Sequence, residues 1–280
     1  MTDAIYVAGP LNAEAVDYIQ NLYSMNLTAA EVEHKGASVF IPGNDIIYGI
    51  WHGGRKYEDY FRNSIEWLRR ADALYLSPNW ENSKGTKREI EEAQLRGIPV
   101  FEDLESLERF LGRPKILCIV GESGTGKTEA AKYIEEAYGI PMLRSYTDRE
   151  PREDDDSHVF LSKEEFDEIP YTDMIVPTNF GSHRYCCRHG DVTDKNSYVI
   201  TEDGYMTMKL AFKARYRVQG LRLLRLEELR INSVGAERIE RDQNRFLLPA
   251  SSYDYVFNNS SNDIGILHNF IDGVMEEFNE

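Results

Sequence analysis

The sequence contains little cysteine and no pattern of metal ligands. Three of its 280 residues are cysteines, which is too few for a disulfide framework in a chain of this length. Cys186 and Cys187 are neighbours in the sequence, where a disulfide between them would be strained. No group of cysteines and histidines has the spacing of a zinc site. These absences predict a reduced protein without a structural metal, and we expect it in the cytoplasm.

Long apolar runs and an excess of positive charge are also missing. No stretch approaches the ~18 apolar residues that cross a membrane, and the first residues lack the basic and apolar segments of a signal peptide. We therefore expect no membrane partner. The formal net charge is −16, which repels the phosphates of DNA and RNA and predicts no nucleic-acid partner. Small phosphorylated ligands are not excluded, because they need only a local cluster of cations.

The first part of the chain alternates between two kinds of segment. Four apolar segments have the length of buried strands: residues 4–9, 37–42, 72–77 and 98–101. Four segments that follow them have helical periodicity or end at a glycine: residues 13–35, 59–71, 85–97 and 102–115. Such an alternation predicts a parallel sheet with helices on both faces.

A domain boundary is predicted near residue 113. Gly112, Arg113 and Pro114 end the last of these helices, since glycine and proline commonly mark a break in regular structure. A new apolar segment then begins at Lys115. We therefore predict two α/β domains, residues 1–112 and 113–280, each a parallel sheet with flanking helices.

The second domain contains a phosphate-binding loop. One segment fits G-x-x-x-x-G-K-[S/T] at every fixed position: Gly121, Glu122, Ser123, Gly124, Thr125, Gly126, Lys127 and Thr128. The glycines let backbone N–H groups surround phosphate oxygens, Lys127 supplies a positive charge, and the Thr128 hydroxyl can bind Mg²⁺. An apolar segment precedes the loop and a helical one follows it, as this motif requires. We predict that ATP and Mg²⁺ bind here.

The stretch after this loop resembles guanylate kinases. The family pattern Ser-Tyr-Thr-Thr-Arg-x-Pro-Arg stands here as Ser145-Tyr146-Thr147-Asp148-Arg149-Glu150-Pro151-Arg152, and Phe160-Leu-Ser-Lys-Glu-Glu-Phe follows it. The resemblance covers residues 115–275 and implies a P-loop kinase fold. It implies that Arg149 and Arg152 bind the phosphate of the acceptor monophosphate, with Ser145 and Tyr185 beside it. Two guanidinium groups suit a phosphate dianion, because each can bind in bidentate fashion.

A further segment, residues 235–246, resembles the lid of these kinases. The resemblance implies that Arg238 and Arg241 close over the donor phosphates and stabilise charge in the transition state. Their spacing of three residues places both on one face of a helix.

The residues that would read the base depart from the family pattern. The short loop after Arg152 leaves Glu153, Asp154 and Asp155 as alternatives for the glutamate that reads guanine. The family's Tyr-Gly-Thr motif matches either Tyr185-Cys186-Cys187 or, in another alignment, Phe180-Gly181-Ser182. We therefore predict a kinase for a different or modified nucleoside monophosphate.

Two stretches of the first domain resemble the nucleoside 2-deoxyribosyltransferase superfamily, in particular a branch common in phages and bacteria. These are residues 5–11 and residues 71–101, where Trp-x-x-Ser-x-Gly-x-x-x-Glu runs from Trp80 to Glu89. The resemblance implies a Rossmann-like fold in which Glu89 attacks the anomeric carbon and a base or water resolves the intermediate. A carboxylate suits this chemistry, because it stabilises and traps an oxocarbenium-like centre. Without this motif Glu89 would be interpreted as solvated, since Glu91 and Glu92 follow it.

The same resemblance implies a nucleotide-binding site. Tyr6 and Gly9 would line the pocket, Asp72 would contact the sugar or the base, and Ser83 and Gly85 would hold a 5′-phosphate at the start of a helix. Enzymes of this superfamily often complete a site with a neighbouring subunit, which implies a homo-oligomer formed through the first domain.

Both domains therefore indicate small-molecule nucleotides as ligands. The hypothesis is a bifunctional enzyme of deoxynucleotide metabolism, which phosphorylates a nucleoside monophosphate in one domain and cleaves or exchanges an N-glycosidic bond in the other. The alternative is a nucleoside monophosphate kinase whose first domain senses a nucleotide without catalysis.

Overall fold

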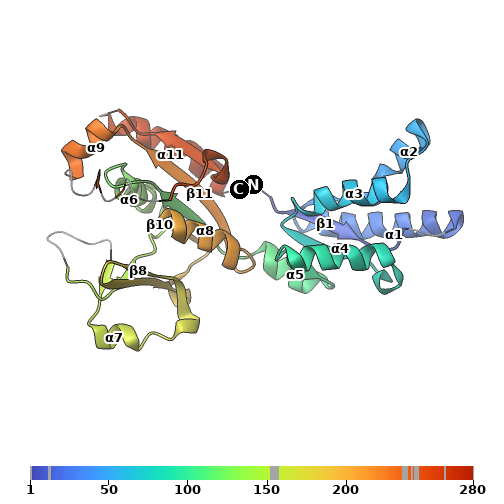
Figure 1. Ribbon diagram of the computed structural model, residues 1–280, viewed down its shortest axis with the longest axis horizontal. Coiled ribbons are helices and arrows are strands. Elements are labelled where there is room, and N and C mark those ends of the chain that lie inside the picture. Colours follow the sequence, from blue (N-terminus) through green and yellow to red (C-terminus); the bar gives the residue numbers. More distant parts are fainter. Residues whose placement is uncertain are drawn as a thin grey trace. The chain divides into compact units, whose positions relative to one another are not determined.

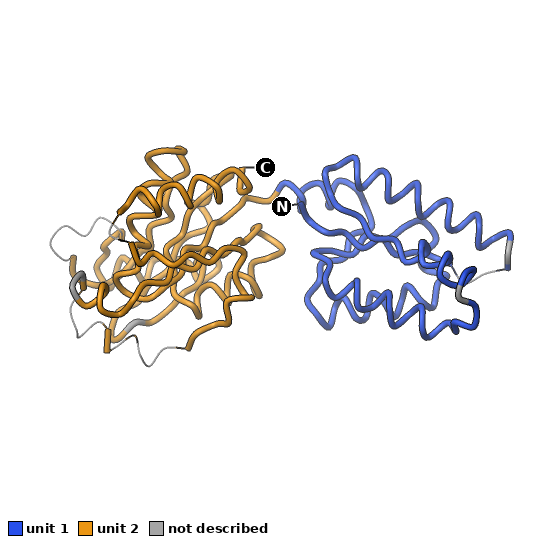
Figure 2. Tube along the Cα trace, turned by 90° about the horizontal axis from the view of Figure 1, so that it is seen from above, with its two compact units in different colours: residues 1–112 blue, residues 113–280 orange. Residues whose placement is uncertain are grey.

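The computed structural model shows an α/β protein, which confirms the predicted fold class (Figure 1). The chain divides into two compact units, Met1–Gly112 and Arg113–Glu280, called unit 1 and unit 2 here (Figure 2). The structure describes residues 2–11, 14–151, 158–234, 239–240, 242, 246–261 and 263–279.

Four parallel strands form the sheet of unit 1, in the order β2-β1-β3-β4. They are β1 (Ala4–Ala8), β2 (Ser38–Phe40), β3 (Ala73–Leu76) and β4 (Val100–Phe101). In the central pair, Ile5 is opposite Ala73 and Ala8 is opposite Leu76. The carboxyl ends of these two strands therefore lie at the same edge of the sheet.

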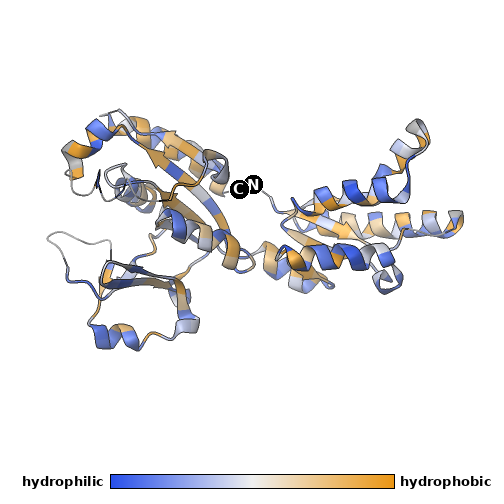
Figure 3. Cartoon of the chain, viewed as in Figure 1, coloured by the Kyte–Doolittle hydropathy of each residue, from blue (hydrophilic) through white to orange (hydrophobic). Residues whose placement is uncertain are grey.

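Helices cover both faces of this sheet. Those that pack on it are α1 (Ala15–His34), α3 (Tyr57–Leu68), α4 (Lys84–Leu95) and α5 (Leu104–Leu111). A short helix, α2 (Ile46–His52), precedes α3 and has largely exposed apolar side chains. Successive residues of β1 point to opposite faces: Ile5 packs with α1 and α5, and Tyr6 packs with α3 and α4. Figure 3 shows the expected distribution, with mostly hydrophobic strands and hydrophilic outer helix faces.

Two features of unit 1 differ from the sequence analysis. Helix α2 was not predicted, because its seven residues are too few to show a helical period. Helix α1 was predicted, but the apolar residues with helical spacing that marked it largely face solvent. Its buried residues include Met25, Ala29 and Val32, which pack on the sheet.

A parallel sheet with the order β10-β5-β11-β12 forms the centre of unit 2. Its strands are β5 (Lys115–Val120), β10 (Lys195–Val199), β11 (Arg217–Leu224) and β12 (Tyr255–Asn258). One face packs against α6 (Lys127–Tyr138) and α11 (Ile264–Asn279). The other packs against α8 (Glu202–Ala211). Two further helices are α7 (Lys163–Asp167) and α9 (Glu227–Val234).

A second, mixed sheet is an addition to the predicted architecture of unit 2. Its order is β7-β6-β9-β8, with one parallel and two antiparallel pairs. The strands are β6 (Ser145–Thr147), β7 (His158–Phe160), β8 (Met174–Phe180) and β9 (His183–Arg188). Strands β8 and β9 form a hairpin, and both contribute to the core that covers one face of the parallel sheet.

Across the part of the chain that the structure describes, no helix is both long enough and apolar enough to cross a membrane.

Candidate active sites

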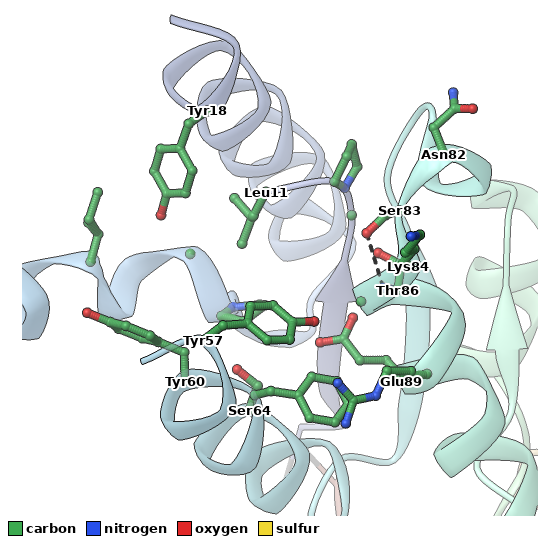
Figure 4. Close-up of a pocket in the computed structure, with 18 residues that line it drawn as sticks. Leu11, Tyr18, Tyr57, Tyr60, Ser64, Asn82, Ser83, Lys84, Thr86 and Glu89 are labelled. Carbon is green, nitrogen blue, oxygen red and sulfur yellow. Dashed lines mark hydrogen bonds between the residues drawn. The ribbon is translucent and has the colours of Figure 1, made fainter. Parts of the chain in front are cut away.

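A pocket with a volume of about 860 Å³ lies at the carboxyl edge of the sheet in unit 1 (Figure 4). One wall is apolar and aromatic: Leu11, Tyr18, Ile46, Tyr57, Tyr60 and Phe61. The opposite side is polar and comes from the start of α4: Asn82, Ser83, Lys84, Gly85 and Thr86. Ligands of open α/β sheets bind at this edge, because the loops that follow the strands meet there.

The carboxylate of Glu89 is directed from α4 into this pocket (Figure 4). Glu89 is only 6% exposed, whereas Glu91 on the same helix faces solvent. The fully buried hydroxyl of Tyr6 donates a hydrogen bond of 2.5 Å to Glu89 Oε1. Glu89 is therefore not one of the solvated glutamates that its charged helix would suggest.

Burial is the main influence on the ionisation of Glu89. It raises the pKa of Glu89 to about 7, because the charged form loses hydration, while the hydrogen bond from Tyr6 lowers the pKa and partly offsets this effect. Burial and the neighbouring carboxylate raise the pKa of Tyr6 well above its usual value. The Tyr6 hydroxyl therefore stays protonated near neutral pH, and the Glu89 carboxyl takes up a proton more readily than an exposed glutamate does.

The start of α4 presents hydrogen-bond donors to the pocket. Ser83 precedes the helix, and its Oγ accepts a hydrogen bond of 3.1 Å from Thr86 N. Thr86 Oγ1 is buried and has no hydrogen-bond partner among the described residues. With the Lys84 side chain and the positive end of the helix dipole, this region is suited to a phosphate or another anion.

Gly9 follows β1 at a point where the backbone passes close to the side chain of Ser77. A Cβ atom at this position would lie 1.8 Å from Ser77 Oγ and 3.1 Å from Ser77 Cβ, so any other residue would require the Ser77 side chain to move. Gly9 and Gly85 both line the pocket.

Asp72 is not brought to this pocket. It immediately precedes β3, where its Oδ2 accepts a hydrogen bond of 2.8 Å from Ala4 N, and its side chain is exposed. Since β1 and β3 are parallel, residues that precede them lie at the amino edge of the sheet, and Glu89 and Gly9 lie at the carboxyl edge. The structure therefore corrects the expectation that Asp72 shares a site with Glu89.

The phosphate loop of unit 2 connects the carboxyl end of β5 to the first turn of α6. Gly126 precedes the helix with φ +99°, and a Cβ there would lie 2.7 Å from Asn259 Nδ2. Asn259 Nδ2 also donates a hydrogen bond of 2.9 Å to Thr125 O. The conformation of the loop is thus supported from β12, whose last residue precedes Asn259.

The two polar side chains expected to handle phosphate and metal lie at the end of the loop. Lys127 Nζ donates a hydrogen bond of 2.8 Å to Glu122 O, across the loop. Thr128 follows in the first turn of α6 and is exposed. The structure therefore brings together all eight residues of the motif around the amino end of one helix.

Charged residues from distant parts of unit 2 surround the loop and were not predicted. Arg230 on α9 contacts Glu122 and Ser123, and Asp242 contacts Ser123. No local pattern in the sequence marks these two residues.

Glu202 follows β10, the strand beside β5, and its Oε1 lies 3.7 Å from Arg222 Nη2. Burial raises the pKa of Glu202, and the Arg222 guanidinium opposes this effect.

The expected acceptor residues lie on and next to the mixed sheet. Ser145 on β6 and Tyr185 on β9 belong to adjacent strands, where Tyr185 is opposite Thr147. Arg149 follows β6, and its guanidinium lies over the Phe160 ring at 5.3 Å. Ser145 Oγ lies 3.4 Å from the Tyr198 hydroxyl.

Several predicted residues fall outside the residues that the structure describes: Arg152, Glu153, Asp154, Asp155, Arg238 and Arg241. Of the two alternatives for the Tyr-Gly-Thr motif, Gly181 and Ser182 form the turn between β8 and β9. Tyr185, Cys186 and Cys187 instead lie within β9, with both cysteines buried.

Two comparisons find similarity to known proteins. Residues 3–102 match the model of a family described as a domain of unknown function (DUF4406). Among solved structures, the chain is similar to guanylate kinase from Anaplasma phagocytophilum. The two are 20% identical, the match covers 59% of this chain and 86% of that chain, and the TM-score is 0.43. No curated protein sequence matches the chain.

Proposed function

We propose that the protein is a bifunctional enzyme of deoxynucleotide metabolism. Unit 2 transfers the γ-phosphate of ATP to a nucleoside monophosphate, and unit 1 cleaves or exchanges the N-glycosidic bond of a deoxynucleotide. The observation that carries the first activity is the complete phosphate loop at the start of α6. The buried Glu89–Tyr6 pair in a pocket of nucleotide size carries the second.

In unit 1, Glu89 is the proposed nucleophile. Its ionised carboxylate attacks the anomeric carbon, the bond from this carbon to the base nitrogen breaks, and the electron pair leaves with the base, which takes up a proton. Water or a second base then attacks the same carbon and releases Glu89. Tyr6 holds the carboxylate in place through its hydrogen bond, so that one oxygen is directed towards the pocket.

The pocket suits a nucleotide placed across its two walls. The aromatic wall offers flat surfaces to a base, because every base has a face that stacks. The start of α4 would hold the 5′-phosphate through backbone N–H groups, Ser83 and Lys84. Glu89 lies about one and a half turns further along α4, roughly 8 Å, which leaves room for the sugar between phosphate site and base.

In unit 2, the loop amides and Lys127 would bind the β- and γ-phosphates, and Thr128 would bind Mg²⁺. When bound, the metal would neutralise part of the negative charge of the donor phosphates. Arg149 and Arg152 would hold the acceptor phosphate, and Arg238 and Arg241 would stabilise charge as the phosphoryl group moves. Their role in this chain rests on the sequence pattern.

One experiment tests both activities. The purified protein is incubated with ATP, Mg²⁺ and each common ribo- and deoxynucleoside monophosphate, including 5-modified pyrimidines, with and without free bases. Mass spectrometry should find a diphosphate from one monophosphate, and free base or an exchanged nucleotide. If no monophosphate yields a diphosphate, the kinase proposal is wrong.

The Glu89→Gln variant separates catalysis in unit 1 from nucleotide sensing. Removal of the nucleophile should lower base release by roughly 10³-fold or more and leave phosphoryl transfer unchanged. Glu91→Gln, on the exposed face of the same helix, is the matched control. If wild type releases no base and Glu89→Gln leaves every activity intact, unit 1 is a sensing domain.

We also propose that unit 1 binds a second copy of the chain. Eight large apolar side chains of α1 and α2 are at least half exposed: Val16, Ile19, Tyr23, Leu27, Ile47, Tyr48, Ile50 and Trp51. Together they present on the order of 1,000 Å² of surface, which is enough for one side of a standard interface. The same helices also contribute Tyr18 and Ile46 to the pocket.

Light scattering after size-exclusion chromatography tests this interface. The wild-type protein should elute as a dimer or a larger oligomer, and Ile50→Glu combined with Trp51→Glu should convert it to a monomer. Leu95→Glu is the control, because Leu95 is 84% exposed on α4, outside this patch. A monomeric wild-type protein would contradict the proposal.

A further inference from the structure

A carboxylate from a distant part of unit 2 binds a backbone amide of the phosphate loop. Ser123 N donates a hydrogen bond of 2.7 Å to Asp242 Oδ2, across 119 residues of sequence. The Asp242 side chain is completely shielded from solvent. A hydrogen bond of this length from an N–H to an ionised carboxylate is of the strong, charge-assisted kind.

Arg230 stands beside this contact and links it to the rest of the loop. Its side chain is 4% exposed, and its Nη1 lies 2.8 Å from Glu122 Oε2. Its Nε donates a hydrogen bond of 2.9 Å to Ser123 O, and its Nη2 lies 3.4 Å from the same Asp242 oxygen that binds Ser123 N. The guanidinium therefore contacts two successive residues of the loop and the carboxylate that covers it.

Backbone amides of a phosphate loop are donors for anionic oxygens. A carboxylate oxygen is chemically the same kind of acceptor as a phosphate oxygen, and it also carries negative charge. A negative charge at the Ser123 amide repels any phosphate bound to the neighbouring amides, and the low exposure of the site weakens the screening of this repulsion by water. Asp242 and a donor phosphate thus compete for the same positive environment.

We propose that Asp242 is an intramolecular phosphate mimic, which occupies an amide of the loop and holds Arg230 beside it until a polyphosphate displaces the carboxylate. This inference rests on the proposed ATP site in unit 2. Binding of the polyphosphate then exchanges one anion for another at Ser123 N, and Arg230 is left with an anionic partner in both arrangements. The buried guanidinium therefore has an anionic partner at all times. A buried charge without such a partner would be costly.

Isothermal titration calorimetry on the full chain tests the proposal with three probes: ATP, inorganic tripolyphosphate and adenosine. Asp242→Asn keeps the shape of the side chain and removes its charge. We expect it to bind ATP and tripolyphosphate about tenfold more tightly than wild type, since the loss of one charge-assisted contact is of this order. Adenosine, which has no phosphate, should bind both proteins equally.

The matched control is Asp254→Asn. Asp254 Oδ2 also accepts a hydrogen bond of 2.7 Å from a backbone amide, that of Gly220, and Gly220 lies in β11 outside the phosphate loop. This control should leave the affinity for ATP and tripolyphosphate unchanged. If both variants tighten binding equally, the effect is not specific to the loop and the proposal is wrong.

The outcomes separate this proposal from the kinase proposal. If wild type binds ATP and Asp242→Asn binds it no more tightly, Asp242 does not compete with phosphate, although the ATP site stands. If neither protein binds ATP or tripolyphosphate, both proposals fail. Circular dichroism shows whether Asp242→Asn folds, and if it does not, Asp242→Ser is measured against the same predictions.

Discussion

The two candidate sites are built in different ways. The phosphate loop of unit 2 consists of eight consecutive residues, and its proposed ligand contacts are largely backbone amides whose direction follows from the loop. The site in unit 1 depends on side chains, of which Tyr6 and Glu89 are 83 residues apart. The geometry of a contiguous motif follows from its own residues. A site assembled from distant side chains forms only when the fold brings these side chains together.

The sites also differ in their electrostatics. The phosphate loop offers the fixed dipoles of its backbone amides and the charge of Lys127. In unit 1, burial raises the pKa of Glu89 to about 7, so the charge of that site changes around neutrality. The comparison leads to four predictions.

The largest effect on phosphoryl transfer should come from Lys127→Ala. Loss of the loop cation should lower phosphoryl transfer about 100-fold or more, and base release by unit 1 should not change. Both rates are measured on the same preparations, and Glu89→Gln should give the opposite pattern. If Lys127→Ala slows both reactions equally, the two sites do not work independently.

The second prediction concerns the stability of unit 1 as a function of pH. Because the folded-state pKa of Glu89 lies near 7 and its ordinary value is 4.5, the folded state keeps a proton that the unfolded state has released. The stability from this group is therefore fully present below about pH 4.5 and is lost as the pH rises through 7. Glu89→Gln cannot ionise and avoids this loss.

From pH 5 to pH 8, the free energy of unfolding of Glu89→Gln should rise relative to wild type by about 2.5 kcal/mol. Urea unfolding of both proteins at the two pH values measures this change. The free energy of unfolding of Glu91→Gln should differ from that of wild type by the same amount at both pH values. A constant difference for Glu89→Gln would mean that burial does not raise this pKa.

The third prediction concerns Tyr6→Phe. The hydrogen bond from Tyr6 lowers the pKa of Glu89, so its removal should raise that pKa by about one unit. The pH at which base release reaches half its maximum should move upwards by the same amount. Tyr75→Phe is the control, because Tyr75 packs on the opposite face of the sheet. An unchanged pH profile in Tyr6→Phe would exclude Tyr6 as the positioning residue.

The smallest effect should come from Asn259→Ala. This variant loses the hydrogen bond of 2.9 Å to Thr125 O, which supports the loop from outside, and a contact of this kind contributes about 1 kcal/mol. The affinity for ATP, measured by calorimetry, should fall about fivefold. Asn258→Ala, one residue earlier and exposed, should leave it unchanged.

The sequence predicted the α/β class and the strands and helices of unit 1 to within a few residues, apart from α2. It could do so because strands buried in a parallel sheet read as short apolar runs. It did not predict the mixed sheet, whose strands β6 and β7 have three residues each and are too short to show a period. The sequence also did not indicate that many of the apolar side chains along one face of α1 would be exposed to solvent. Helical periodicity shows that such side chains share a face, but it does not show whether another part of the protein packs on that face.

The sequence by itself determined the phosphate loop, because glycine, lysine and threonine at fixed spacing specify a backbone conformation and a cation locally. It also determined that Glu89 stands early in a helix after Ser83. Only the tertiary structure decided that Glu89 is buried against Tyr6, that Asp72 lies at the opposite edge of the sheet, and that Asp242 reaches the loop amide. These outcomes depend on strand direction and on contacts between distant segments, and desolvation then sets the ionisation of the groups that meet there.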